Sequence, residues 1–301
     1  MNRKLIKQGM GGYTLTLPVK WIRENHLENV NEVEVTETNE GLLLTGKQLI
    51  KEKRIAIDVS SFDERMILNI LNQLYRTGYD YVDITYKDEK AYHQIQSIVR
   101  DVLLGFEIVH KKDNICAIQN IAEPEEQKFD IILRRIFLQI KELSLTVFSS
   151  FEKNIFLLPE ILETKIQIDK LTNYARRTII RAKISGQRNV LLYSVVSQLS
   201  LIAHSYYYLS AYFFGKKKKI DAKKLDFLVF VNDLYNSFYE SFYTKDLLAL
   251  NKIGESKNDF FEKTEKILEK STGVDAVFLS YLRELVRLIQ MCIPSTLGAI
   301  I

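Results

Sequence analysis

The chain has few of the residues from which catalytic and metal sites are usually built. Its two cysteines, Cys116 and Cys292, lie far apart and form neither a disulfide framework nor a metal-binding motif. Its four histidines stand singly, without the partner spacing that a proton relay requires. The sequence has no P-loop, no dinucleotide-binding glycine fingerprint, no H-E-x-x-H motif and no nucleophile elbow. We therefore expect a protein that is not an enzyme and whose cysteines are buried and reduced.

The sequence also has no strong excess of charge and no apolar run at its start. The opening MNRKLIKQG lacks the hydrophobic core of a signal peptide, which favours a cytoplasmic protein. A net charge of +4 is too small to indicate a polyanionic partner, so the location of the basic residues matters more than their number. A length of 301 residues predicts two or three domains.

One long segment, residues 190–215, lacks Asp, Glu, Lys and Arg altogether. It is long enough to cross a bilayer. However, Gln198, His204 and five serines within it are costly in lipid unless they find partners. A helix that is apolar all round is also typical of the centre of a large bundle. A buried bundle helix is therefore the preferred interpretation, and a membrane span is the alternative.

Residues 1–46 are predicted to form a small β-rich domain. Glycines between residues 9 and 12 supply a turn before the alternating strand YTLTLP. Pro18 ends that strand and suits the first turn of the short helix VKWIREN. The following NEVEVTETNEGLLLTG alternates on both sides of a turn, which is typical of a hairpin.

Residues 47–123 have the pattern of an α/β unit. The strand RIAIDVS is followed by a helix that Gly78 closes, and the strand YDYVDITYK by a helix that Gly105 closes. A hairpin over FEIVHKKDNICAIQNI completes the order βαβαββ, which predicts helices on one face of a sheet. Pro124 marks the next boundary.

Residues 124–301 are predicted to be a helical bundle. Six amphipathic or buried helices are expected near residues 125–151, 159–186, 189–214, 221–245, 247–270 and 274–293. KIQIDKL at 165–171 and ESKNDFF at 255–261 lie 90 residues apart, each in the second helix of a set of three, which indicates an internal repeat. The lysines of 216–224 fall between the two sets, as a solvated linker or as a nucleic-acid contact.

The order of elements in residues 1–46 resembles the AbrB/SpoVT swapped-hairpin family. The resemblance rests on a basic strand, a glycine turn, a strand ending in proline, a basic helix and a closing hairpin. It implies an obligate dimer in which hairpins of two chains interleave into one barrel, so that the partner supplies half of the core. It also implies DNA binding, and the basic residues that match the pattern or lie beside it are Arg3, Lys4, Lys7, Lys20 and Arg23.

Two departures from this family keep a second interpretation open. Tyr13 stands where many members have an arginine after the turn, and residues 24–40 hold six glutamates and no Lys or Arg. The positive charge is thus confined to residues 3–23. DNA contact through this patch is favoured because phosphate binding needs clustered Lys and Arg rather than net charge. The alternative is a dimerisation domain with a solvated basic edge.

The helical half resembles PhoU, a regulator of phosphate uptake built from two three-helix repeats. Archaeal-type proteins with a swapped-hairpin head and a PhoU-like tail resemble this chain over nearly its whole length, including the middle unit. The resemblance implies a regulator of phosphate homeostasis. PhoU also docks on partner proteins, so the alternative is an interaction protein that binds a transporter or a signalling partner without touching DNA.

PhoU proteins can hold divalent metal ions on E-x-x-x-D motifs. Carboxylates four residues apart share one helix face and can present oxygens to a cation. Here one motif is intact, Glu255 with Asp259, whereas Lys165 replaces the acid before Asp169. The acids of the third helices are replaced by His204 and Gln290. Solvated helix carboxylates are thus the preferred interpretation of Glu255 and Asp259, and candidate metal ligands are the alternative.

The aromatic stretch Tyr206–Tyr208 with Tyr212–Phe214 points around its helix, so some rings face the core and others face outward. Core packing is the first interpretation and a docking surface the second. The sequence as a whole predicts an α+β multidomain protein: a swapped-hairpin domain at 1–46, an α/β domain at 47–123 and a PhoU-like bundle at 124–301. The preferred function is that of a dimeric DNA-binding regulator.

Overall fold

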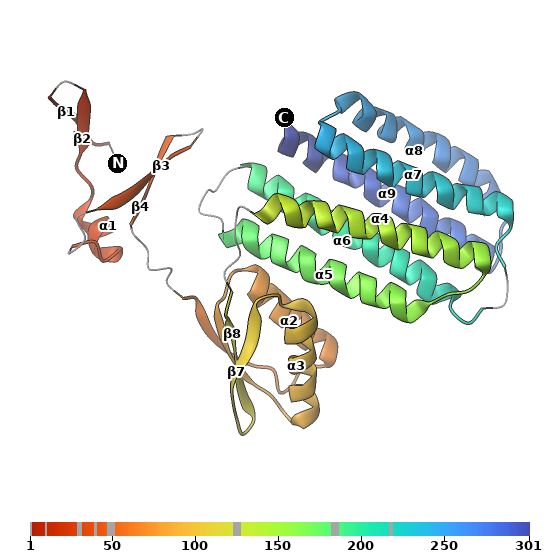
Figure 1. Cartoon of the computed structure of the whole chain (residues 1–301), viewed down its shortest axis with the longest axis horizontal. Coiled ribbons are helices and arrows are strands. Elements are labelled where there is room, and N and C mark those ends of the chain that lie inside the picture. Colours follow the sequence, from red (N-terminus) through yellow and green to blue (C-terminus); the bar gives the residue numbers. More distant parts are fainter. Residues whose placement is uncertain are drawn as a thin grey trace. The chain divides into compact units, whose positions relative to one another are not determined.

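The computed structural model describes residues 2–9, 11–28, 32–38, 41–46, 52–122, 128–181, 187–216 and 219–301. The chain divides into two compact units, Met1–Glu52 and Lys53–Ile301 (Figure 1). We call the first the N-terminal unit. The second contains an α/β layer, residues 53–122, and a helical bundle, residues 128–301. The domain boundaries expected near residues 47 and 124 lie outside the described residues.

The N-terminal unit is small and β-rich, as predicted. Strands β1 (Leu5–Gln8) and β2 (Gly12–Leu15) pair antiparallel, and helix α1 (Val19–Glu24) follows directly after Pro18. Strands β3 (Val33–Thr38) and β4 (Gly41–Gly46) form a second antiparallel hairpin. The first turn uses Gly9 at a φ of 57°, a conformation that other residues adopt at a cost.

The α/β layer has the predicted order βαβαββ. Its elements are β5 (Arg54–Asp58), α2 (Glu64–Arg76), β6 (Tyr81–Thr85), α3 (Glu89–Val102), β7 (Phe106–Lys112) and β8 (Ile115–Asn120). The strand order in the sheet is β5-β6-β8-β7, with β5 and β6 parallel and the other neighbours antiparallel. One face of the sheet is apolar: Val82 and Ile84 of β6 are buried, while Asp83 between them is exposed.

The two helices of the layer begin and end as their sequences predict. Asp63 and Asp88 cap them, each accepting a hydrogen bond from the backbone N–H three residues later. Gly78 and Gly105 follow them with φ values of 85° and 83°. A Cβ atom at Gly105 would lie 2.9 Å from the carbonyl oxygen of Ala122, so only glycine fits this close approach.

The bundle consists of six helices, as predicted. They are α4 (Phe129–Lys153), α5 (Leu158–Arg181), α6 (Gln187–Phe213), α7 (Ala222–Thr244), α8 (Leu247–Leu268) and α9 (Val274–Ile300). The expected end of the last helix at residue 293 is wrong, because α9 continues through Pro294. Thr296 and Ala299, beyond the proline, are buried in the bundle, and this packing offsets the hydrogen bond that proline removes.

The two sets of three helices occupy corresponding places in the bundle. Helices α6 and α9, the third of each set, pack on one another at its centre, and α4 packs on α7 (Figure 1). The second helices, α5 and α8, lie outside, each against the first and third helix of its own set. The segments 165–171 and 255–261 therefore fall on equivalent helices, as the internal repeat predicts.

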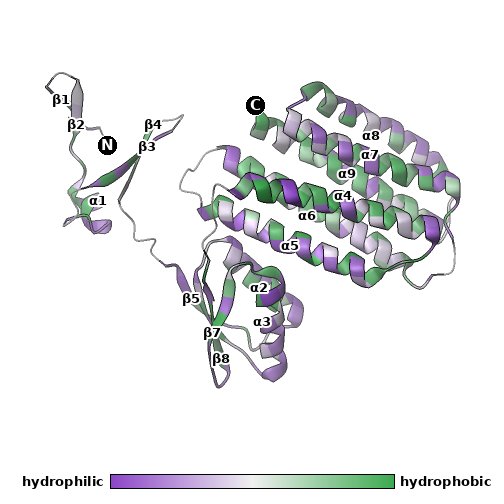
Figure 2. Ribbon diagram, viewed as in Figure 1, coloured by the Kyte–Doolittle hydropathy of each residue, from purple (hydrophilic) through white to green (hydrophobic). Residues whose placement is uncertain are grey.

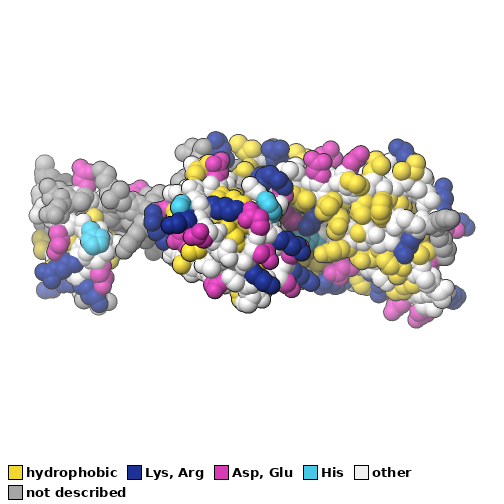
Figure 3. Space-filling model, turned by 90° about the horizontal axis from the view of Figure 1, so that it is seen from below, with side chains coloured by type: hydrophobic (Ala, Val, Ile, Leu, Met, Phe, Trp, Pro, Cys, Tyr) yellow, Lys and Arg dark blue, Asp and Glu magenta, His cyan; other side chains and the backbone are white. Residues whose placement is uncertain are grey.

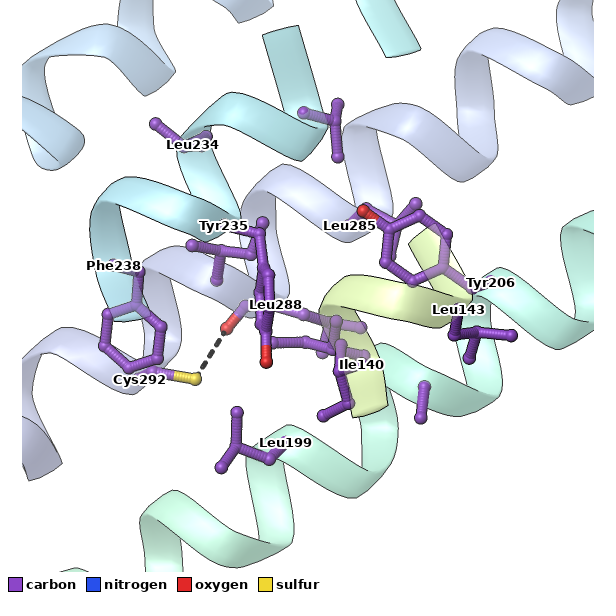
Figure 4. Packing of buried hydrophobic residues seen from close by; sticks show 14 of the residues in the cluster. Ile140, Leu143, Leu199, Tyr206, Leu234, Tyr235, Phe238, Leu285, Leu288 and Cys292 are labelled. Atoms are coloured by element: carbon purple, nitrogen blue, oxygen red, sulfur yellow. Dashed lines mark hydrogen bonds between the residues drawn. The ribbon is translucent and has the colours of Figure 1, made fainter. Parts of the chain in front are cut away.

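The core of the bundle joins α4, α6, α7 and α9. Figure 4 shows Ile140, Leu199, Phe238 and Leu285 converging from these four helices, and all four side chains are fully buried. The segment from residue 190 to the end of α6, which lacks Asp, Glu, Lys and Arg, thus belongs to a bundle helix. No helix in the described part of the chain is long and apolar enough to cross a membrane.

The aromatic stretch of α6 divides between core and surface. Tyr206 and Phe213 are buried, and the Tyr206 hydroxyl donates to Asn232 of α7. Tyr208 and Phe214 are exposed. Core packing therefore explains only part of this stretch.

The α/β layer is joined to the bundle by α5, on which α2 and α3 pack (Figure 1). Arg177 of α5 has no solvent exposure at its side chain. It donates to the carbonyl oxygens of Tyr75 at 2.9 Å and Tyr79 at 2.7 Å, and to the carboxylate of Asp80 at 2.6 Å. The three acceptors come from the last turn of α2 and from the segment between α2 and β6.

We call this contact between α5 and the α/β layer the seam. Asp80 supplies the negative charge that balances Arg177 in it. Besides Arg177 it accepts from Arg181, one turn further along α5, and from the backbone N–H of Lys53. Burial raises the pKa of Asp80, but the hydrogen bond from Lys53 and the two guanidinium groups outweigh it, so the pKa lies below its usual value. The carboxylate is charged at neutral pH and satisfied on both oxygens.

We expect Asp80→Asn to lower the free energy of unfolding by about 3–5 kcal/mol, because it leaves the Arg177 guanidinium buried without a counter-charge. Urea denaturation, monitored by the circular dichroism signal of the helices, measures this change in the free energy of unfolding. Asp83→Asn, an exposed carboxylate on the same β6, is the matched control and should change stability by less than about 0.5 kcal/mol. Equal effects of the two substitutions would show that the buried ion pair does not stabilise the seam.

Candidate functional site

The five basic residues predicted to contact DNA all lie in the N-terminal unit and are exposed. Arg3 and Lys4 precede β1, and Lys7 lies within it, opposite Tyr13 of β2. Lys20 and Arg23 lie on α1. On the face seen in Figure 3, basic side chains gather at one edge of this unit beside acidic ones. The structure thus places one of these residues in β1, two directly before it and two on α1.

The two basic residues of α1 have acidic neighbours. Lys20 Nζ lies 3.8 Å from Glu24, and Arg23 Nε lies 3.2 Å from Glu28. All four side chains are well exposed, so these ion pairs contribute little to stability. A more highly charged anion can therefore displace the two carboxylates from Lys20 and Arg23.

The hairpins of the N-terminal unit present apolar side chains to solvent. Leu5 of β1 and Leu15 of β2 are register partners, and Leu5 is 67% exposed. Leu42 of β4 is 69% exposed. Leu27 is the one buried hydrophobic residue among those described in this unit. The described residues of this unit taken by itself therefore form almost no hydrophobic core.

The candidate metal ligands do not form a cage. Glu255 and Asp259 lie on an exposed part of α8, and Glu255 accepts a hydrogen bond from Asn251. In the described ranges, no group of three or more His, Cys, Asp or Glu residues could hold a metal ion. The divalent ion that the PhoU resemblance implies does not fit these two residues.

The equivalent place on α5 carries a charge cluster instead. Lys165 Nζ lies 2.6 Å from Asp169 Oδ2, and His204 Nε2 of α6 lies 2.7 Å from Asp169 Oδ1. The lysine ammonium thus stands beside the carboxylate where a cation would bind. Burial raises the pKa of Asp169, but His204 and Lys165 together outweigh it, so the pKa is lowered.

This cluster faces a cleft of about 340 Å³ between α2 and α3 of the α/β layer and α5 and α6 of the bundle. Its polar lining includes Asn72, Arg76, Ser97, Asp101, Lys165, Asp169, Asn173, Ser200 and His204. Leu68, Ile98, Val102 and Ile166 supply apolar walls. The cleft thus combines groups from two layers of the second unit.

Asn173 holds the inner end of the cleft together. Its Oδ1 accepts from Arg76 Nε at 2.8 Å, and its Nδ2 donates to Asn72 at 3.0 Å and to the carbonyl of Val102 at 3.2 Å. This buried amide therefore connects α5 with both α2 and α3 and fixes the direction of the Arg76 side chain.

A second guanidinium, that of Arg176, lies near that of Arg76 but is buried deeper in the protein. Arg176 of α5 is buried and donates to Ser197 of α6 at 3.2 Å. Burial, reinforced by the positive charge of Arg76, lowers the pKa of Arg176 to about 10. Burial also lowers the pKa of Arg76, although the negative charge of Asp169 opposes this. Two cations thus stand close together with limited access to water.

The sequence does contain a signal for this cleft, in the spacing of polar residues along α5. Lys165, Asp169, Asn173, Arg177 and Arg181 recur every four residues along α5 and so share one helix face. Hydrophilic segments recur along α5 in Figure 2. Such a polar stripe usually faces solvent, but here α2 and α3 cover it.

Comparison of the chain with protein-family models, curated proteins and solved structures finds no match.

We expect Asp169→Asn to destabilise the protein by about 1–3 kcal/mol at neutral pH, because Lys165 and His204 lose a charged acceptor. The pKa of Asp169 is lowered in the folded state, so its contribution is present above pH ~4 and is lost as pH falls through the folded-state pKa. Unfolding free energies of wild type and variant should therefore converge in acid. Asp233→Asn, exposed on α7, is the control, and a difference that persists in acid would contradict the charge argument.

Proposed function

We propose that this chain is a dimeric DNA-binding transcriptional regulator, in which the N-terminal unit pairs two copies and presents its basic residues to DNA. One observation carries the proposal: the N-terminal unit exposes apolar side chains on both hairpins and buries one hydrophobic residue among those described. A domain of about 50 residues without a core does not fold stably alone. A second copy supplies the missing half, as in the swapped-hairpin family.

The basic residues support DNA as the ligand of the paired units. Arg3 and Lys4 directly before β1 and Lys7 within it are exposed, and a two-fold axis doubles them. Clustered Lys and Arg bind phosphates irrespective of the acidic residues elsewhere in the domain. Arginine can in addition recognise guanine edges in the major groove.

Phosphate uptake or homeostasis is the process that the resemblance of the bundle to PhoU favours. The two corresponding sets of helices, α4–α6 and α7–α9, support that resemblance. In this proposal the bundle senses a signal or binds a partner, and the N-terminal unit acts on DNA.

The second candidate function is an interaction protein that docks on a transporter or a signalling partner. An apolar groove of about 490 Å³ between α8 and α9 favours it. Leu247, Met291 and Pro294 line the groove, and the neighbouring Leu248 is 77% exposed. The N-terminal unit would then only dimerise.

Dimerisation through the hairpins predicts that Leu5→Asp or Leu42→Asp produces a monomer. Each substitution acts twice in a two-fold dimer and removes about 3–6 kcal/mol of apolar burial, which weakens association more than about 100-fold. Multi-angle light scattering across a dilution series measures this. Leu248→Asp is the control, and a monomer produced only by Leu248→Asp would place the dimer contact in the bundle instead.

DNA binding predicts a steep salt dependence. If about six of the ten basic groups of the dimer touch phosphates, log K should fall with log salt at a slope near −5. Lys7→Ala removes two contacts per dimer, so it should weaken binding to every sequence and flatten the slope by roughly 2. Arg23→Ala should reduce affinity at least as much.

Anisotropy titrations of labelled duplexes over a salt series provide the measurement, with a random-oligonucleotide selection to find the preferred site. Lys112→Ala, an exposed lysine of β7, is the matched control and should leave the slope unchanged. Absence of binding at low salt, or equal effects of the Lys7 and Lys112 substitutions, would favour the interaction-protein function.

A further inference from the structure

We infer that the cleft between α2–α3 and α5–α6 binds a small-molecule dianion, either a phosphate-type oxyanion or a dicarboxylate. This inference concerns the second unit alone, and it stands or falls independently of whether the N-terminal unit binds DNA. It rests on the charges that line the cleft, the way they are held and the layers from which they come.

The cleft is lined by two cations and two carboxylates, and two further arginines, Arg100 and Arg176, adjoin it. Arg76 and Lys165 line it and Arg176 lies behind them, and these three cations share the single carboxylate of Asp169. The other acid of the lining, Asp101, is already neutralised by Arg100, with which it forms two hydrogen bonds of 2.7 and 2.9 Å. The described groups around the cleft therefore have a surplus of two positive charges, before any protonation of His204.

This surplus of positive charge is destabilising, because the cleft is partly shielded from water. Like charges near one another disfavour the charged form, and burial adds to the effect. Burial and the neighbouring positive charge of Arg76 both act on Arg176, whose pKa falls to about 10. A ligand with two negative charges would neutralise the surplus, and a chloride ion would leave half of it.

The geometry suits an oxyanion rather than a halide. Arg76 Nε donates to Asn173, and this hydrogen bond fixes the side chain. The two terminal nitrogens of the guanidinium then face a ligand that has paired oxygens. Asn72, Ser97 and Ser200 add amide and hydroxyl groups around the same space. A volume of about 340 Å³ holds a small metabolite, and Leu68, Ile98 and Val102 can cover its uncharged part.

The cations come from both sides of the seam. Arg76 belongs to α2 of the α/β layer, whereas Lys165 and Arg176 belong to α5 of the bundle. A dianion between them would contact both layers at once and hold them together. The binding site is thus also a point at which a small molecule can stabilise the joint between the layers.

The test is isothermal titration calorimetry of the full chain at low ionic strength and pH 7. The probes are inorganic phosphate, ribose 5-phosphate, succinate and chloride. We expect at least one of the three dianions to bind at a single site per chain. Chloride at the same concentration should not bind. Phosphate and ribose 5-phosphate distinguish a free oxyanion from a phosphate monoester, and succinate reports a dicarboxylate. Absence of saturable binding for all three dianions would overturn the inference.

A matched pair of variants on α2 locates the site. Arg76→Gln should weaken binding at least about 10-fold, and Arg65→Gln, an exposed arginine of the same helix, should leave it unchanged. Ser97→Leu fills the cleft without altering charge, so it should also abolish binding even if Arg76→Gln perturbs folding. Equal losses for the two arginines, or normal binding by Ser97→Leu, would show that the dianion binds elsewhere.

Discussion

The arrangement of the second unit depends on one buried cation, Arg177. A guanidinium without solvent exposure requires acceptors, and it finds two backbone carbonyls and the carboxylate of Asp80 at the end of α2 and directly after it. These groups cannot be satisfied unless the α/β layer lies on α5. Apolar contact alone would tolerate sliding between the layers, whereas this set of short hydrogen bonds defines one register.

The same face of α5 explains why a charged cleft exists next to a structural joint. The stripe that ends in Arg177 and Arg181 begins with Lys165 and Asp169, one helix turn apart at each step. At one end the α/β layer supplies carbonyl and carboxylate acceptors for Arg177 and Arg181. At the other end it supplies a further cation, Arg76, and the layers leave a space. Joint and cleft are therefore two parts of one polar interface.

Much of this fold is visible in the sequence because it follows from local rules. The turns at Gly78 and Gly105, the alternation in β6 and the apolar periodicity of six helices each predict the element that forms. The end of α9 and the covering of α5 were not predictable in this way. Burial of Thr296 and Ala299 decides the first, and packing of α2 and α3 decides the second. Both depend on residues distant in the chain, which the local pattern of a helix does not identify.

The two buried cysteines have a practical consequence for attaching chemical probes. Cys116 lies in the sheet of the α/β layer and Cys292 in the bundle core, where its thiol donates to the carbonyl of Leu288 (Figure 4). Burial raises the pKa of Cys116 to about 11 and that of Cys292 further, so neither provides the thiolate that maleimides attack. A cysteine introduced on the surface would therefore be the selective point of attachment in the otherwise native chain. Two such positions, one in each compact unit, would carry a pair of spin labels whose separation reports how the units are arranged in solution.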